Sequence, residues 1–202
     1  MRVSLIGATG NAGSRIRAEL AQRGHQVTAV ARYPERVPRL DGVIAKECDA
    51  NRVDDLAPVL RGHDVVVRSV HFLDGQADKL IDAVPGARAS LRRRWRRGQP
   101  RQWRGRQADR CGRRARAIQG GIASGLRVPR RAGLTSDLDW TFLSPSAQFV
   151  AGERTGVFRL GTDTALRDAS GRSWISYEDY AVALVDEIEQ PRHSQRRFTV
   201  GY

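Results

Sequence analysis

Three glycines at regular spacing stand near the start of the chain, in the stretch "GATGNAG" from Gly7 to Gly13. They form a G-x-x-G-x-x-G pattern directly after an apolar run, and a helical pattern follows them. A missing side chain permits a tight turn, a close approach of backbone to pyrophosphate, and close packing of helix on strand. The helix N-terminus would present unpaired N–H groups to the phosphates. The pattern predicts a dinucleotide site formed by Gly7, Thr9, Gly10, Asn11, Ala12 and Gly13; the alternative is a purely structural turn.

The residues that end the second predicted strand bear on the choice of cofactor. A site specific for NAD usually has Asp or Glu there, to hold the ribose 2′-OH. This chain has Ala31, Arg32 and Tyr33 instead. Arg32 would suit a 2′-phosphate, which favours NADP while leaving NAD possible, or it is a solvated strand-end arginine. Asp49, after the third strand, would border the adenine or simply form a turn.

No catalytic group stands out from its spacing. The Tyr-x-x-x-Lys pair used as a proton relay by short-chain dehydrogenases does not occur after Tyr33, Tyr177 or Tyr180. The four histidines show no spacing typical of metal ligands, so no metal site is predicted.

The elements that must position these residues alternate between strand and helix patterns. Predicted strands cover residues 2–7, 25–32, 42–50, 63–70, 138–146 and 196–202. Predicted helices cover 11–23, 53–62 and 75–84, and a last one is capped by Ser176 with Asp179 three residues on. This alternation predicts an α/β, Rossmann-like three-layer fold with a mainly parallel sheet. We expect a single domain over residues 1–202, with 146–202 as a small substrate-side region.

The positive charge of the chain is concentrated in one segment. The formal net charge is +13, but residues 86–131 contain 16 arginines and one acid, Asp109, whereas the rest carries 19 basic and 21 acidic side chains. The segment has no period of 2 or 3.6, so we expect residues of about 86–133 to be irregular and to form no fifth strand. Taken literally, it would be a nucleic-acid-binding insert with Trp95 and Trp103 stacking on bases. That interpretation is the least favoured, because such an insert would replace a central strand.

No apolar stretch approaches the roughly 18 residues of a membrane span. The apolar run at the amino terminus is also too short for a signal peptide. A cytoplasmic protein with no membrane partner is therefore expected.

Several longer stretches resemble one known family. They include "IGATGNAGSRI", "RGHQVTAVAR" and "ISYEDYAVALVDEIEQPRHSQRRFTVGY", and they are similar to the atypical short-chain dehydrogenase/reductases known as NADH-flavin reductases, relatives of biliverdin reductase B and NmrA-like proteins. The resemblance implies an NAD(P)H-binding oxidoreductase that reduces flavin or another small acceptor, or else a sensor of the NmrA type without turnover. It implies that Val70 and His71 lie along the cofactor and that Ser144 and Pro145 border the nicotinamide. The sequence departs from the family at Arg68 and His71.

The arginine-rich segment stands where this family has its fifth strand, a glycine-rich loop and a helix. If the codons are read one base later, "RRWRRGQP" at residues 93–100 can encode V-V-G-G-A-G-S-L, and the single codon of Trp95 fixes the first glycine. We interpret the segment as an out-of-frame translation between one insertion or deletion near residues 84–89 and a compensating one near 132–135.

Overall fold

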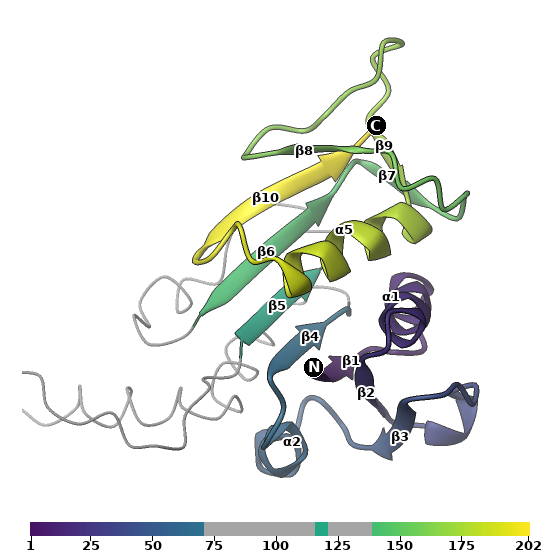
Figure 1. Cartoon of the computed structure of the whole chain (residues 1–202), viewed down its shortest axis with the longest axis vertical. Coiled ribbons are helices and arrows are strands. Elements are labelled where there is room, and N and C mark those ends of the chain that lie inside the picture. Colours follow the sequence, from purple (N-terminus) through teal and green to yellow (C-terminus); the bar gives the residue numbers. More distant parts are fainter. Residues whose placement is uncertain (71–115, 121–138) are drawn as a thin grey trace, which may run out of the picture.

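The β-branched runs of the sequence form strands of one large sheet in the computed structural model, which describes residues 1–70, 116–120 and 139–202 (Figure 1). The strands are β1 (Arg2–Ile6), β2 (Gln26–Ala31), β3 (Val43–Glu47), β4 (Val65–Arg68), β5 (Arg116–Gly120), β6 (Trp140–Pro145), β7 (Gln148–Val150), β8 (Arg159–Gly161), β9 (Trp174–Ser176) and β10 (Arg196–Gly201). The helices are α1 (Asn11–Gln22), the short 3-10 helix η1 (Pro34–Arg36), α2 (Val53–Leu60) and α5 (Tyr177–Glu189). The helix predicted at 75–84 lies outside the described residues.

The main sheet has the order β3-β2-β1-β4-β5-β6-β10-β8. All neighbouring strands in it are parallel except β10 and β8, which are antiparallel. The arrows of β4, β5, β6 and β10 accordingly point toward the same edge (Figure 1). β7 and β9 form a separate two-stranded sheet. Because these strands are parallel, the carboxyl-terminal ends of β1, β2, β3, β4 and β6 lie at one edge of the sheet. Ligands bind at this edge in folds of this type.

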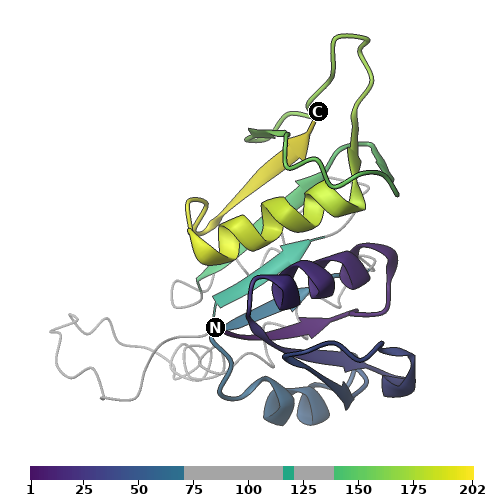
Figure 2. The same cartoon turned by 45° about the vertical axis from the view of Figure 1, so that its right-hand side comes forward.

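Two hydrophobic cores fill the two faces of this sheet. The larger core joins Ile16 and Leu20 of α1 with Leu184 of α5, and these two helices lie side by side on one face (Figure 2). The smaller core packs Leu56 and Leu60 of α2 against strand residues that point to the opposite face. Helix, sheet and helix are therefore stacked as three layers, which confirms the predicted fold class.

The prediction that the arginine-rich segment forms no fifth strand was wrong. β5, which lies inside that segment, is paired in parallel with β4 on one side and β6 on the other. Backbone N–H and C=O groups make these pairings, so a strand needs no particular side chains to fill the position. A gap there would leave two inner strands with unpaired edges. The rest of the segment, and with it the expectation that it is irregular, lies outside the described residues.

A polar network connects α1, α5 and the connection of residues 151–158. Glu19 is buried and accepts hydrogen bonds from Arg23 and, through both of its carboxylate oxygens, from Arg154. Asp179 is fully buried and accepts from the hydroxyls of Thr155 and Tyr202. These carboxylates fix the connection against both helices near the strand ends.

Candidate functional site

Gly7 and Gly13 are required by the packing of the turn between β1 and α1. Gly7 has a φ of +85°, and a Cβ there would lie 2.2 Å from the carbonyl oxygen of Ser69. A Cβ on Gly13 would lie 2.0 Å from the carbonyl oxygen of Gly7. Both contacts are with backbone atoms, which have little room to move. These two glycines therefore have a structural role whether or not a ligand binds.

Gly10 is different, because the protein itself does not exclude a side chain there. Its φ of −73° and ψ of 170° suit any residue, and a Cβ would meet only the Gly7 carbonyl oxygen, at an ordinary 3.5 Å. The residue is exposed. The fold thus supplies no reason for glycine at this position, whereas a phosphate lying against the backbone would.

The first turn of α1 has unsatisfied backbone donors. Gly10 is the N-cap and has no side chain to cap the helix, and the first turn contains no acidic residue. The amides of Asn11, Ala12 and Gly13 have no hydrogen-bond partner among the residues that the structure describes. Helix α5 contrasts with it, since Ser176 caps that helix by accepting from the amide of Asp179. The free donors and the helix dipole make the N-terminus of α1 suitable for an anion.

The remaining residues of the predicted turn have mixed placements. Thr9 is exposed beside Gly10, and Ala12 is half-buried. The Asn11 side chain is turned toward α5, with its Nδ2 3.5 Å from the hydroxyl of Tyr177. The backbone amide of Asn11 has no described partner and stays available to a phosphate.

Arg32 follows the end of β2, and the glycine turn follows the end of β1, at the same edge of the sheet. The pairing of these two strands ends at Ile6 and Val30, so Ala8 and Arg32 each follow the last pair by two residues. Arg32 is exposed and makes no ion pair or hydrogen bond with another described residue. Its charge is available to an anion at this edge.

Asp49 has a local structural role after β3. Its carboxylate accepts hydrogen bonds from the backbone amide of Asn51 at 2.9 Å and from the Asn51 side chain at 3.0 Å. This geometry is the turn-forming alternative raised from the sequence. The residue remains half-buried at the edge, so bordering the adenine stays a prediction.

The end of β4 touches the glycine turn. Val70 is half-buried, and its Cγ1 lies 2.6 Å from the Cβ position that a side chain on Gly7 would have. His71 lies outside the described residues. Arg68 is buried at the end of β4, and this burial lowers the pKa of its guanidinium. Arg68, one of the two residues at which the chain departs from the family, is therefore part of the interior beside the turn.

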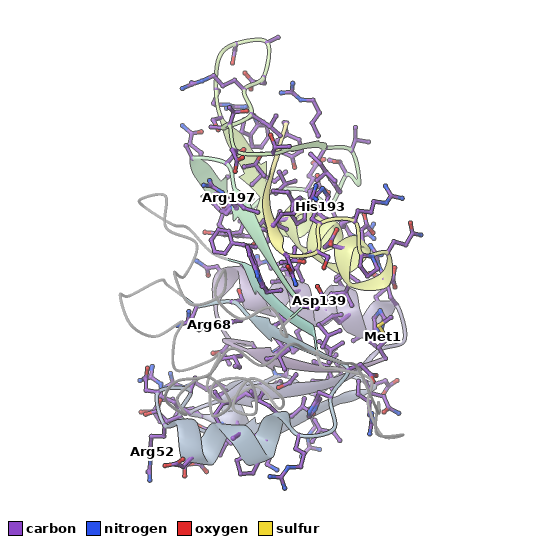
Figure 3. All side chains as sticks on the ribbon, turned by 90° about the vertical axis from the view of Figure 1, so that its left-hand side faces the viewer. Met1, Arg52, Arg68, Asp139, His193 and Arg197 are labelled. Carbon is purple, nitrogen blue, oxygen red and sulfur yellow. The ribbon has the colours of Figure 1, made fainter. Side chains whose placement is uncertain are left out.

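Ser144 and Pro145 end β6, two strands away from β4 in the sheet. Ser144 is buried, and its hydroxyl accepts a hydrogen bond of 2.9 Å from Nε of Arg197 on β10. Arg68 and Arg197 thus come from strands that β5 and β6 separate (Figure 3). The sequence pattern did not identify Arg197, because the pairing of β10 with β6 joins residues more than fifty positions apart.

The described ranges contain neither a cluster of metal ligands nor a membrane-spanning helix. There is no group of three or more His, Cys, Asp or Glu residues that could hold a metal ion within residues 1–70, 116–120 and 139–202. The helices described there include none long and apolar enough to span a bilayer.

A glycine turn that leads from the first strand into an uncapped helix, on a parallel sheet of this order, defines the class of Rossmann-type dinucleotide-binding folds. The chain belongs to a family of NAD(P)H-binding proteins, whose sequence model matches residues 7–93. The uncharacterized protein YwnB of Bacillus subtilis is 31% identical to it, over 99% of this chain and 98% of that protein. The family match includes the glycine turn and ends inside the arginine-rich segment.

Solved structures share the fold. A protein of Bacteroides thetaiotaomicron with a proposed epimerase activity is 31% identical, with a TM-score of 0.77, over 100% of this chain and 96% of that one. A proposed NADH-flavin reductase from Streptococcus pneumoniae is 22% identical, with a TM-score of 0.73, over 100% and 99% of the two chains. A short-chain dehydrogenase/reductase from Veillonella parvula, solved with NADP, is 15% identical, with a TM-score of 0.70, over 100% and 94%. The last two show similarity of fold alone.

Proposed function

We propose that the protein is an NAD(P)H-dependent reductase that passes a hydride from the nicotinamide to a flavin or a similar small acceptor. The observation that carries the proposal is the open N-terminus of α1. Three amides without a described partner and a glycine without an internal packing role lie next to one another at this helix start. This arrangement fits the pyrophosphate of a nicotinamide dinucleotide, and the family match supports that ligand.

The chemistry of such a reaction requires little from the protein side chains. A bound nicotinamide supplies the hydride, while the protein supplies binding, orientation and exclusion of water. The turn residues would hold the phosphates, and Ser144 and Pro145 would border the nicotinamide at the end of β6. Arg197 would fix the Ser144 hydroxyl in place through the hydrogen bond described above. The named activity of the Streptococcus pneumoniae protein supports a flavin acceptor.

Preference for NADPH over NADH is the second part of the proposal. Arg32 has no partner among the described residues and leaves the sheet beside the glycine turn. A guanidinium placed there can pair with a 2′-phosphate through charge-assisted hydrogen bonds, which NADH cannot form at that position. The Veillonella parvula structure shows that a protein of this fold can hold NADP.

The proposal is tested by two measurements on the full chain. Titration with NADPH and with NADH, followed by nicotinamide fluorescence, should show saturable binding that is tighter for NADPH. Addition of FMN, FAD or riboflavin should then make NADPH oxidation continue through many turnovers. Boiled protein and free flavin provide the controls for uncatalysed oxidation.

The two measurements separate the competing functions. Binding of NADPH without turnover on any flavin would contradict the reductase and favour a sensor of the NmrA type. The absence of binding for both dinucleotides would remove the whole proposal.

A further inference from the structure

Arg17 is a buried cation on α1 for which the described part of the chain provides no counter-charge. It is 5% exposed, and no carboxylate among the described residues forms an ion pair with it. Its one hydrogen bond runs from Nη1 to the carbonyl oxygen of Ala8, at 3.3 Å. The buried Nε has no acceptor in the described part of the chain. Burial lowers the pKa of the guanidinium, so the surroundings disfavour its charge.

The side chain of Arg17 lies beside the glycine turn. Side chains of an α-helix lean toward its N-terminus, and Ala8 is part of the turn that precedes α1. Arg17 therefore reaches back along the helix toward the end where the three free amides lie. Arg15, Glu19 and Arg23 occupy another side of α1, where they pair with residues of α5 or of the 151–158 connection. Arg17 takes no part in that network.

A buried arginine without a counter-charge is costly, because a single hydrogen bond to a carbonyl repays little of its desolvation. The glycine turn also has N–H donors without a described partner, and Arg32, which follows the adjacent strand, forms no ion pair with a described residue. Arg17, the N-terminus of α1 and the backbone of Arg32 thus all lie at the edge of the sheet where β1 and β2 end. Each of these features favours an anion, and no described carboxylate supplies one.

We infer that Arg17 is a specificity-determining residue whose buried charge is compensated by a phosphate group of the bound dinucleotide. The inference rests on the proposed function, since it requires a dinucleotide at the glycine turn. Arg17 acts from beneath the turn, and its bond to the Ala8 carbonyl also sets the position of the turn. Its charge lowers the stability of the ligand-free protein and strengthens binding of the ligand.

The test is the Arg17→Met variant, which keeps the length and apolar volume of the side chain and removes its charge. We expect the dissociation constant for NADPH to rise about tenfold or more, as for loss of a hydrogen bond to a charged group. The melting temperature of the ligand-free protein should stay unchanged or rise, because an unpaired buried charge has been removed. Arg17→Lys should recover part of the lost affinity. Arg61→Met, an exposed change just after α2 at the opposite edge of the sheet, serves as the matched control.

Comparison of NADPH with NADH identifies the phosphate. If Arg17→Met loses affinity for NADPH alone, Arg17 contacts the 2′-phosphate. If it loses affinity equally for NADPH and NADH, Arg17 contacts the pyrophosphate. Either result supports the inference. Two results would overturn the inference about Arg17 and leave the proposed function intact. One is an unchanged NADPH affinity in Arg17→Met. The other is weaker NADPH binding together with a lowered melting temperature. If the wild-type protein binds neither dinucleotide, the proposed function itself fails.

Discussion

Replacement of Gly10 by valine separates ligand binding from folding. The valine Cβ would make only one contact within the protein, at 3.5 Å, and the backbone angles suit any residue. Loss of glycine at an N-cap costs up to about 1 kcal/mol, and the smaller conformational freedom of the unfolded chain offsets about 0.4–1 kcal/mol. The free energy of unfolding should therefore change by less than about 1 kcal/mol.

The effect of the same change on cofactor binding should be much larger. The valine methyl groups would occupy the open space beside the free amides of Asn11, Ala12 and Gly13. If the phosphates are displaced from two of these donors, two charge-assisted hydrogen bonds are lost, each worth about 1.5–3 kcal/mol. The loss is then about 3 kcal/mol or more, which is roughly a hundredfold in dissociation constant.

Urea unfolding and NADPH fluorescence titration measure the two effects on the same protein samples. Ala18→Val is the matched control, because it adds the same branched side chain to an exposed position of α1. Gly13→Ala provides the opposite case, since its Cβ would lie 2.0 Å from a backbone oxygen and should destabilise the fold by about 1–3 kcal/mol or more. A Gly10→Val protein that binds NADPH like the wild type, or that unfolds, would refute the assignment of Gly10 to the ligand.

Three further variants test the surroundings of the site. Arg32→Ala should weaken NADPH by about 1–3 kcal/mol and leave NADH nearly unchanged in the same titration, and equal losses would contradict its pairing with a 2′-phosphate. Glu19→Gln should lower the free energy of unfolding by about 1–3 kcal/mol at neutral pH. The hydrogen bond from Arg154 holds the pKa of Glu19 below its ordinary value. The stabilisation by the Glu19 carboxylate is therefore present above about pH 4.3 and is lost as the pH falls through the folded-state pKa. A stability difference between Glu19→Gln and wild type that persists in acid would argue against this role of the carboxylate. Tyr202→Phe should cost about 1 kcal/mol in urea unfolding, because Asp179 loses a donor. Burial raises the pKa of Tyr202, so the wild-type advantage should hold below about pH 10 and disappear as the pH rises through the folded-state pKa, and an advantage that grows above pH 10 would count against this account.

The elements at both ends of the chain follow from local patterns, and the structure confirms them. β1, α1 and β2 begin and end within a few residues of the predicted ranges, because apolar period, glycine and capping residues act over short distances. Ser176 caps α5 as predicted, with its hydroxyl accepting from the amide of Asp179. The parallel arrangement also follows from the alternation of strands and helices.

β5 could not be predicted in the same way. Its sequence, Arg116–Gly120, has no distinguishing period, and its position between β4 and β6 is set by two strands that need a neighbour. Pairing of this kind depends on backbone groups far away in sequence, which a local pattern does not contain. The out-of-frame interpretation of the segment concerns its origin and stays a prediction; resequencing of the gene tests it directly.

Arg17 is a functional candidate that the sequence indicates through its position on α1. It lies four residues after Gly13 and three before Leu20, so it shares the helix side of two residues that are buried. A charged residue at such a position departs from the binary pattern that otherwise holds for α1. Departures of this kind are expected where function outweighs local stability. The sequence pattern of α1 shows that Arg17 is out of place, but only the structure shows that its side chain is buried and that its Nε has no acceptor among the described residues.

Helices α1 and α5 give this argument an internal comparison, since they pack side by side on the same face of one sheet. At the N-terminus of α5, the Ser176 hydroxyl accepts a hydrogen bond from the amide of Asp179, and the buried Asp179 carboxylate accepts hydrogen bonds from the hydroxyls of Thr155 and Tyr202. Within the described ranges, three amides at the N-terminus of α1 have no partner, and the buried Nε of Arg17 beside them has no acceptor. Packing requirements alone would allow both helices to be capped. Of these two helices, the one with the unpartnered first-turn amides is the one that the glycine turn opens, as expected if a phosphate completes that end of the fold.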